Sequence, residues 1–403
     1  MDYDVVVVGA GPVGSTAARY AAKHGAKVLL VEEHASIGSP VGCTGLLSTK
    51  AVAECDVRPS DEFVFNSVRG AFVHAPDGQC LPIDGKTTKA HVVSRKNLDR
   101  TLATLAVEEG VELSLRTTVV GLEKAGNSPV KLKVLRNGKP ENINAGVVIG
   151  ADGVKSRIAR YAGLGMAERV LPGVQFEAPY ASDDSAFVEL FPGSQAPGFF
   201  AWTVPLNERI SRIGLAVEPK LLGQGETPIS CLKKFLDSNP HVKVRYGGGM
   251  LDFVVGGIPI GPPEKTSTDG VLVVGDAAGQ AKPTSGGGVY PGALAAKIAG
   301  RVAAEAALEG DTGSGRLSEY DRLWRKALGK ELEIGMKVHD HIGKLEDRQL
   351  NELIASLNKA SILDTITEYG DMDHPSVVLK KLMLSGNSLR LMKAFGTFVR
   401  TLF

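Results

Sequence analysis

The first residues of the chain that could do chemistry are glycines that follow a run of four valines. Val5–Val8, with no polar alternation, indicates a parallel strand buried on both faces. Gly9, Gly11 and Gly14 come directly after it. At this spacing the first glycine allows a tight turn, the second lets the backbone approach a pyrophosphate, and the third lets helix and strand pack closely. The pattern predicts phosphate binding at the start of a helix over residues 15–24.

A carboxylate follows the next apolar strand. Residues 27–31 end in Glu32, about 20 residues beyond the glycines, where a carboxylate accepts hydrogen bonds from ribose hydroxyls. An acid here disfavours a 2′-phosphate, so the residues favour the adenosine half of FAD or NAD over NADP. The alternative is that Glu32 is an ordinary loop acid before Glu33.

Two later strands also run into small residues and an acid. Residues 147–149 lead into Gly150-Ala151-Asp152, and residues 270–274 lead into Gly275-Asp276. A glycine-rich loop at 283–288 and a long helix from about Pro291 to Leu308 follow the second junction. The chain therefore has three such junctions, at Gly9, Gly150 and Gly275. The alternative for Asp276 is a plain helix N-cap.

A loop of small residues, Ile37–Leu47, follows Glu32 and carries one thiol, Cys43. Such a loop can lie flat along a ligand. The four cysteines of the chain show neither the density of a disulfide scaffold nor a Cys-x-x-Cys pair; they are Cys43, Cys55, Cys80 and Cys231. We therefore expect reduced thiols, no metal site and a cytoplasmic protein.

Composition and charge exclude several classes of function. The 403 residues suffice for two domains, or for one large domain with an insertion. The 46 Lys and Arg balance 45 Asp and Glu, so no global field indicates a nucleic-acid partner. The N-terminus lacks the basic and apolar regions of a signal peptide. The longest uncharged stretch, residues 190–207, contains three prolines and is not expected to span a membrane; they are Pro192, Pro197 and Pro205.

The remaining pattern indicates a nucleotide-binding domain that a sheet domain interrupts. An amphipathic helix from Arg95 is expected to end at Gly110. Strands are expected at 111–115, 117–122 and 130–135, and the last two form a hairpin. Residues 63–83 indicate two strands around the turn Pro76-Asp77-Gly78. From 172 to 257 strands alternate, with one helix near 229–237. The predicted strands of this stretch are Ala186–Phe191, Phe199–Val204 and Arg212–Val217.

The order and content of the three junctions resemble the FAD-binding fold of the p-hydroxybenzoate hydroxylase type. In that family the motif at Asp276 places a carboxylate on the ribityl chain, and the following glycine loop faces the flavin pyrimidine edge. Arg95 matches an arginine near the pyrophosphate; its alternative is a surface cation. The resemblance assigns these residues to FAD: Gly9, Gly11, Val13, Gly14, Glu32, Gly42, Cys43, Gly45, Arg95, Val119, Asp276, Gly287, Gly288 and Val289.

The expected fold class is α/β, with a Rossmann-like FAD-binding domain, an inserted antiparallel-sheet substrate domain and a helical C-terminal region. The FAD-binding domain is discontinuous and takes residues 1–62, 90–171 and 258–316. The sheet domain takes residues 63–89 and 172–257. The C-terminal region is 317–403.

Within this superfamily the chain is most similar to the geranylgeranyl reductases, including those that act on digeranylgeranylglycerophospholipids in archaea. Residues 39–46 resemble their cysteine-glycine loop beside the isoalloxazine, although the loop is one residue shorter. Residues 200–205 resemble their Tyr-x-Trp-x-Phe-Pro signature, with Phe200 in place of the tyrosine and Val204 in place of the phenylalanine. The resemblance implies that Phe200 and Trp202 bind substrate; their alternative is a place in the core.

The resemblance implies an FAD-dependent reductase that saturates isoprenoid C=C bonds of a prenylated lipid. Cys43 is the candidate catalytic proton donor or flavin neighbour, and its alternative is a small buried hydrophobe. No second complete glycine unit exists for a nicotinamide, so a nicotinamide nucleotide or a ferredoxin-like protein is expected to dock transiently. An FAD monooxygenase or halogenase is the alternative enzyme. A flavin or prenyl-lipid carrier without turnover is the alternative outside catalysis.

The C-terminal thirty residues mix basic and apolar side chains without an acid after His374. The basic ones are Lys380, Lys381, Arg390, Lys393 and Arg400. This mixture is typical of helices in a membrane interface and predicts peripheral contact with a membrane. The alternative is that these helices pack on the core of the protein.

Overall fold

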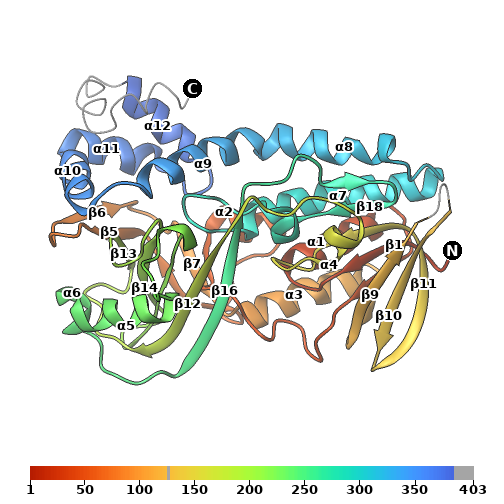
Figure 1. The fold of residues 1–403 in the computed structure, drawn as a ribbon, viewed down its shortest axis with the longest axis horizontal. Coiled ribbons are helices and arrows are strands. Elements are labelled where there is room, and N and C mark those ends of the chain that lie inside the picture. Colours follow the sequence, from red (N-terminus) through yellow and green to blue (C-terminus); the bar gives the residue numbers. More distant parts are fainter. Residues whose placement is uncertain (125–127, 385–403) are drawn as a thin grey trace.

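An eight-stranded sheet forms the centre of the nucleotide-binding domain, at the right of Figure 1. The computed structural model describes residues 1–124 and 128–384. The central strands are parallel and run in the order β8 (Glu112–Ser114), β2 (Val28–Val31), β1 (Tyr3–Val8), β11 (Lys139–Gly150) and β18 (Val271–Val273). Antiparallel strands join this sheet at β18 and β11: β17 (Ser267–Thr268) pairs with β18, β10 (Val130–Arg136) pairs with the first half of β11, and β9 (Thr117–Glu123) pairs with β10.

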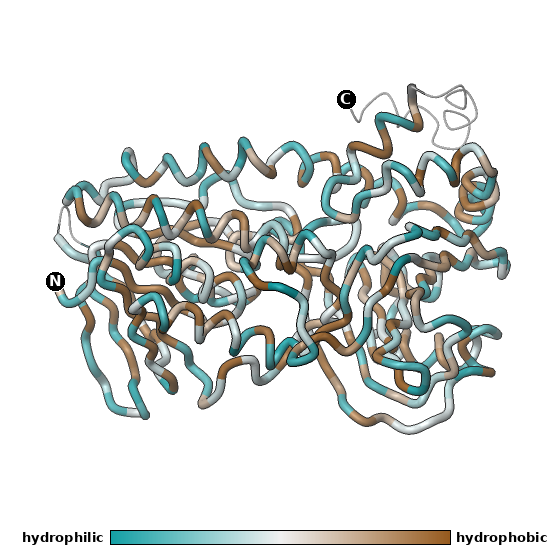
Figure 2. Tube along the Cα trace, turned by 180° about the vertical axis from the view of Figure 1, so that it is seen from behind, coloured by the Kyte–Doolittle hydropathy of each residue, from teal (hydrophilic) through white to brown (hydrophobic). Residues whose placement is uncertain are grey.

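The four valines are buried on both faces of this sheet, as their lack of alternation predicts. Val5 and Val7 pack in one core cluster with three helices, while Val6 and Val8 pack in a second cluster with β9 and β10. The three helices are α1 (Pro12–Lys23), α3 (Arg95–Glu108) and α7 (Val289–Glu309). Figure 2 shows these strands as a hydrophobic bundle inside the fold. A Cβ on Gly300 would lie 2.4 Å from the Ala17 carbonyl oxygen, so glycine lets α7 pack directly on α1.

The second sheet has seven strands and forms the left part of Figure 1. Its order is β16 (Asp252–Ile260), β12 (Arg169–Pro179), β15 (Ile210–Ala216), β14 (Phe200–Pro205), β13 (Phe187–Pro192), β5 (Gly70–His74) and β6 (Cys80–Asp84). All neighbours are antiparallel except β13 and β5. Side chains of α5 (Pro228–Ser238) and α6 (Pro240–Lys243) pack in one cluster with this sheet.

Two features of the strands differ from the sequence-based expectations. Residues 63–83 hold three strands instead of two, because β4 (Val64–Val68) leaves before Gly70 to join a different sheet. That sheet has three strands, β3 (Leu46–Ser48), β7 (Ala90–Val93) and β4, and α2 (Thr49–Glu54) follows β3. The strand expected at 147–149 is the end of the longer β11, whose first half pairs with β10 and whose second half pairs with β1.

The C-terminal region is helical throughout its described part, as expected. It consists of α8 (Ser314–Trp324), the π-helical turn η3 (Arg325–Gly329), α9 (Lys330–Ile342), α10 (Asp347–Leu357), α11 (Ala360–Tyr369) and α12 (Pro375–Leu384). The short elements α4 (Arg157–Tyr161), η1 (Pro219–Leu221) and η2 (Gly275–Ala278) complete the fold. In the part of the chain that the structure describes, no helix combines the length and the apolarity that a membrane span requires. The membrane-contact expectation falls mostly on residues 385–403, outside the described residues.

Candidate active site

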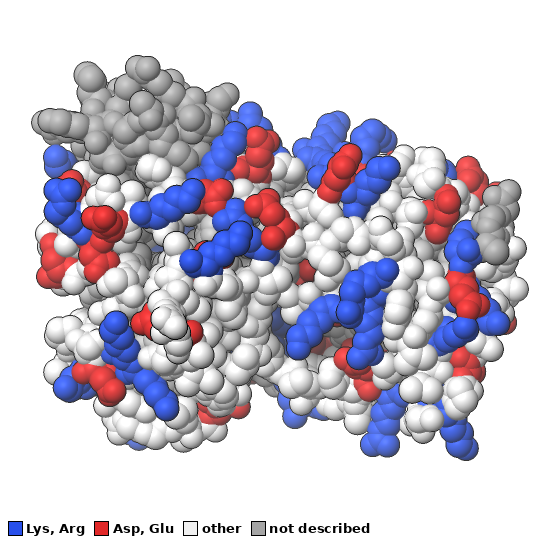
Figure 3. Space-filling model, in the orientation of Figure 1, with Lys and Arg blue, Asp and Glu red and all other residues white. Residues whose placement is uncertain are grey.

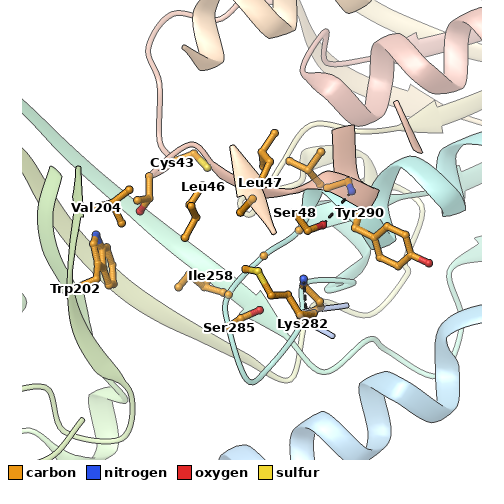
Figure 4. A pocket seen from close by; sticks show the side chains of 18 of the residues that line it. Cys43, Leu46, Leu47, Ser48, Trp202, Val204, Ile258, Lys282, Ser285 and Tyr290 are labelled. Carbon is orange, nitrogen blue, oxygen red and sulfur yellow. Dashed lines mark hydrogen bonds between the residues drawn. The ribbon is translucent and has the colours of Figure 1, made fainter. Parts of the chain in front are cut away.

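A cavity of about 1170 Å³ is bounded by the three-stranded and seven-stranded sheets, by the turns that follow β1, β11 and β18, and by the C-terminal helices. Ligand pockets usually measure about 300–1,000 Å³, so this cavity has room for more than one small ligand. The glycine turn and the loop around Asp276 line one part of it. Figure 4 shows the other part, where Cys43 and Leu46 lie across from Trp202 and Val204 of β14.

The three glycines of the first turn divide into two roles. Gly11 lines the cavity at the start of α1, and a Cβ there would meet nothing within 4 Å. Gly9 has φ +100°, and a Cβ on it would lie 2.4 Å from the Ala151 carbonyl oxygen. A Cβ on Gly14 would lie 1.8 Å from the Gly9 carbonyl oxygen. Gly9 and Gly14 therefore shape the turn, while Gly11 leaves space for phosphate.

Glu32 lies beside this turn, at the end of β2. Its Oε2 accepts a hydrogen bond from the Ala10 N–H at 3.0 Å, and its Oε1 accepts one from the His34 N–H at 2.9 Å. The carboxylate is thus oriented by the backbone next to the phosphate turn, outside the residues that line the cavity. Val119 does not line it either, because its side chain is buried in the core on β9. Contact of Val119 with a ligand would have to come from its backbone.

Asp276 lines the cavity and follows β18 directly. A Cβ on Gly288 would lie 2.7 Å from the Asp276 Oδ1, so a glycine is required beside the carboxylate. Asp276 lies within the first turn of η2, whose N-cap is Val274, so the helix N-cap interpretation of Asp276 is wrong. Burial raises the pKa of Asp276, and the positive charge of Arg95 acts in the opposite direction. Val13, Gly287 and Val289 also line this part of the cavity.

Arg95 is a buried cation of the cavity wall, which rules out the surface interpretation. Its side chain is 14% exposed, and its Nε and Nη2 donate to the two carboxylate oxygens of Asp99 at 3.0 and 3.2 Å. Burial lowers the pKa of Arg95, but its interaction with the charge of Asp99 acts against burial, and the net effect raises the pKa. Asp99 lies one helical turn after Arg95, and this i, i+4 spacing was the only signal for it in the sequence.

Cys43 lines the cavity and accepts a hydrogen bond from the Gly45 N–H, with 3.3 Å between nitrogen and sulfur. Gly42 also lines the cavity, but Gly45 does not. Gly45 has φ +72°, and a Cβ on it would lie 2.5 Å from the Arg212 Nη1. Arg212 donates to the Thr44 carbonyl oxygen at 2.6 Å and pairs with Glu177 at 3.0 Å. Sequence reasoning missed this anchor because Arg212 is distant in the chain.

Phe200 and Trp202 line the cavity and are also part of the packed sheet, so the core interpretation is confirmed and substrate contact stays a prediction. Trp202 is 8% exposed, and its Nε1 donates to the Gln175 Oε1 at 3.0 Å. Phe200 stacks on Phe199 with ring centroids 4.1 Å apart. These contacts hold both rings in fixed positions.

The segment 366–378 closes another side of the cavity, which the sequence did not indicate. Asp373 is central to it, with a side chain that is 1% exposed. Lys282 Nζ donates to Asp373 Oδ1 at 2.5 Å, and the Ser48 hydroxyl donates to Oδ2 at 2.6 Å. These bonds connect the loop after η2 with β3 and with the link between α11 and α12.

The residues present fit FAD. The open face at Gly11 and the N-terminus of α1 suit a pyrophosphate, the carboxylate of Asp276 suits ribityl hydroxyls, and the N-terminus of α7 at Gly288 suits the electron-rich edge of the flavin ring.

Comparison with known proteins agrees with this geometry. The family described as FAD dependent oxidoreductase matches residues 4–167. Digeranylgeranylglycerophospholipid reductase of Methanothrix thermoacetophila is 36% identical over 90% of this chain and 93% of its own. Digeranylgeranylglycerophospholipid reductase 2 of Methanothermobacter thermautotrophicus is 36% identical over 92% of this chain and 98% of its own.

Among solved structures, a geranylgeranyl bacteriochlorophyll reductase-like protein of Thermoplasma acidophilum has a TM-score of 0.87 at 26% identity, over 98% of this chain and 99% of its own. A halogenase solved in complex with FAD has a TM-score of 0.72 at 14% identity, over 100% of this chain and 86% of its own, and shares the fold alone. The chain therefore belongs to the digeranylgeranylglycerophospholipid reductase family, and FAD is its cofactor.

Proposed function

We propose that the protein saturates the C=C bonds of geranylgeranyl chains on an archaeal-type membrane lipid precursor. The observation that carries this proposal is the shape of the cavity: the part that suits a flavin opens into an apolar part under the seven-stranded sheet. Val188, Leu190, Trp202 and Val204 line this apolar part. A prenyl chain matches such a wall, since it has no polar group to satisfy. The names of the relatives support the same substrate class.

The chemistry requires one hydride and one proton for each bond that is saturated. Reduced FAD supplies the hydride when it is bound. An isolated alkene has no carbonyl to polarise, so the protein contributes by holding the bond close to the flavin and by excluding water. The packed rings of Phe200 and Trp202 contribute to both: they hold the bond in place and they exclude water.

Cys43 is our candidate for the proton donor. The thiol lines the cavity, and its sulfur accepts a hydrogen bond from the Gly45 N–H. This N–H would solvate the sulfur after it has given up its proton. The thiol is regenerated by a proton from water, so the balance of each cycle is two electrons and two protons per C=C bond.

The lipid carries an anionic headgroup, and cations line the cavity as well. Lys50 lies on α2, and Lys89 directly precedes β7. Lys50 pairs with Asp371 at 2.5 Å, while the Lys89 side chain is half-buried at the cavity wall. We place the headgroup on this side. The electrons come from a donor that docks transiently, either a nicotinamide nucleotide or a ferredoxin-like protein.

The test is product mass under controlled oxygen. The purified flavoprotein is reduced with dithionite, mixed with a digeranylgeranyl glycerophospholipid without oxygen, and the lipid is extracted. We expect mass gains in steps of two hydrogens. Products that form only with oxygen, or with oxygen and halide, would instead indicate the monooxygenase or halogenase chemistry. Lipid recovered unchanged in both conditions, with flavin bound, would indicate a carrier.

A further inference from the structure

Two histidines and a glutamate meet on the side of the seven-stranded sheet that faces away from the cavity. They are His74 on β5, Glu189 on β13 and His241 on α6. Val188 and Leu190 line the cavity, so Glu189 between them points to the opposite face, because side chains alternate along a strand. One potential ligand atom from each of the three residues lies within 4.8 Å of the other two.

Hydrogen bonds satisfy only part of this cluster. Glu189 is 1% exposed, and its Oε2 accepts the Tyr180 hydroxyl at 2.6 Å. Its Oε1 lies 2.6 Å from His241 Nε2 but 3.9 Å from His74 Nε2. His74 is 9% exposed, and within the described residues its buried Nε2 has no hydrogen-bond partner. A buried polar atom without a partner is unfavourable and calls for an explanation.

We propose that His74, Glu189 and His241 form a binding site for Zn²⁺. Imidazole nitrogens and a carboxylate oxygen are typical zinc ligands, with bond lengths of about 2.0–2.2 Å. Tetrahedral geometry then separates ligand atoms by roughly 3.3 Å. The two distances to Glu189 Oε1, 2.6 and 3.9 Å, lie on either side of this value. A bound zinc ion would be coordinated by His74 Nε2. It would also move His241 Nε2 slightly away from Glu189 Oε1.

Two further features support a metal at this site: a hydrogen bond that orients Glu189 and a route for the ion from solvent. The Tyr180 hydroxyl orients Glu189, as outer hydrogen bonds commonly do for metal ligands. The His241 side chain is 24% exposed, which gives a metal a route from solvent and leaves the fourth position to water. The bound ion would join α6 to two strands of the sheet whose other face lines the cavity. This role is structural and does not depend on the proposed reaction.

The cysteine spacing gave no hint of this site, because its ligands lie far apart in the sequence. The test uses untagged, flavin-loaded protein that is dialysed against Zn²⁺ and then against zinc-free buffer. We expect elemental mass spectrometry to find about one zinc ion per chain. His241→Ala, on the short outer helix, should lose nearly all of it, while His24→Ala at the exposed end of α1 should keep it.

Added Zn²⁺ should also raise the Tm of the metal-free wild type and leave that of His241→Ala unchanged. A more conservative variant, His74→Gln, should lose zinc as well. Flavin content should be the same in all four proteins, which separates this test from that of the reductase activity. Trace zinc in the loaded wild type, equal zinc in His241→Ala, or iron in place of zinc would overturn the proposal.

Discussion

Asp276 is the residue through which flavin binding can be tested most directly. Its carboxylate lines the cavity beside Gly288, and we expect it to accept hydrogen bonds from the ribityl hydroxyls of FAD. A hydrogen bond to a charged group is worth about 1.5–3 kcal/mol. We therefore expect Asp276→Ala to weaken FAD binding by about tenfold to a hundredfold, measured as the ratio of flavin to protein absorbance after dialysis. Asp61→Asn, on an exposed loop, is the control. Full retention of flavin by Asp276→Ala would remove this residue from the site.

Cys43 allows the proton-transfer role to be separated from flavin binding. Cys43→Ala should keep FAD, because the loop is held by the bonds of Arg212 rather than by the thiol. Loss of a general acid typically costs a factor of about 10²–10⁴, so we expect alkene reduction to slow by at least about a hundredfold. The comparison is with Cys231→Ala, which removes a buried thiol from the far side of the sheet. If turnover of Cys43→Ala equals that of the control, the thiol has only a packing role.

Residue identities in the glycine turn and at Asp276 were predictable because local rules govern them. A positive φ at Gly9 and the absent Cβ at Gly11 follow from the turn itself. Asp99 and Arg212 were not predictable in the same way. Their roles depend on which residues the fold brings beside them. In the sequence, Arg212 cannot be distinguished from an arginine that is exposed to solvent.

At the scale of elements, periodicity was informative wherever an element buries a regular face. The helix from Arg95, the hairpin of β9 and β10, and α7 all lie where the pattern predicted them. The separation of β4 from β5 was not predictable, because their partners belong to two different sheets. The position of α11 and α12 against the cavity was also missed, since amphipathic helices show a buried face but not what covers it.

The Lys282–Asp373 pair offers a test of this cover. Removal of one partner from a buried ion pair costs about 3–5 kcal/mol, because the other charge stays buried. We expect Asp373→Ala to lower the free energy of local unfolding of residues 360–384 by about 3 kcal/mol, measured by amide hydrogen exchange. Asp364→Ala, on the exposed side of α11, should leave exchange unchanged. Equal protection in both variants would show that the pair does not hold the cover in place.

At the scale of the whole molecule, acidic and basic side chains are interspersed on the face shown in Figure 3, in keeping with a net charge of +1. Attraction to a membrane must therefore be local. We expect the full chain to sediment with anionic vesicles at low salt and to be released at high salt. A chain that ends at Leu384 should bind them less but keep its FAD, because Val378, which lines the cavity, is retained. Undiminished vesicle binding by the shortened chain would assign the contact to another surface.

The central claim is that the flavin of this protein passes its electrons to an alkene. The most direct measurement is a single turnover without oxygen, in which the protein with fully reduced FAD is mixed with excess digeranylgeranyl lipid and the flavin absorbance is followed. The account predicts that the spectrum of oxidised flavin returns, with one C=C bond saturated for each flavin oxidised. Flavin that stays reduced until oxygen is admitted would contradict it.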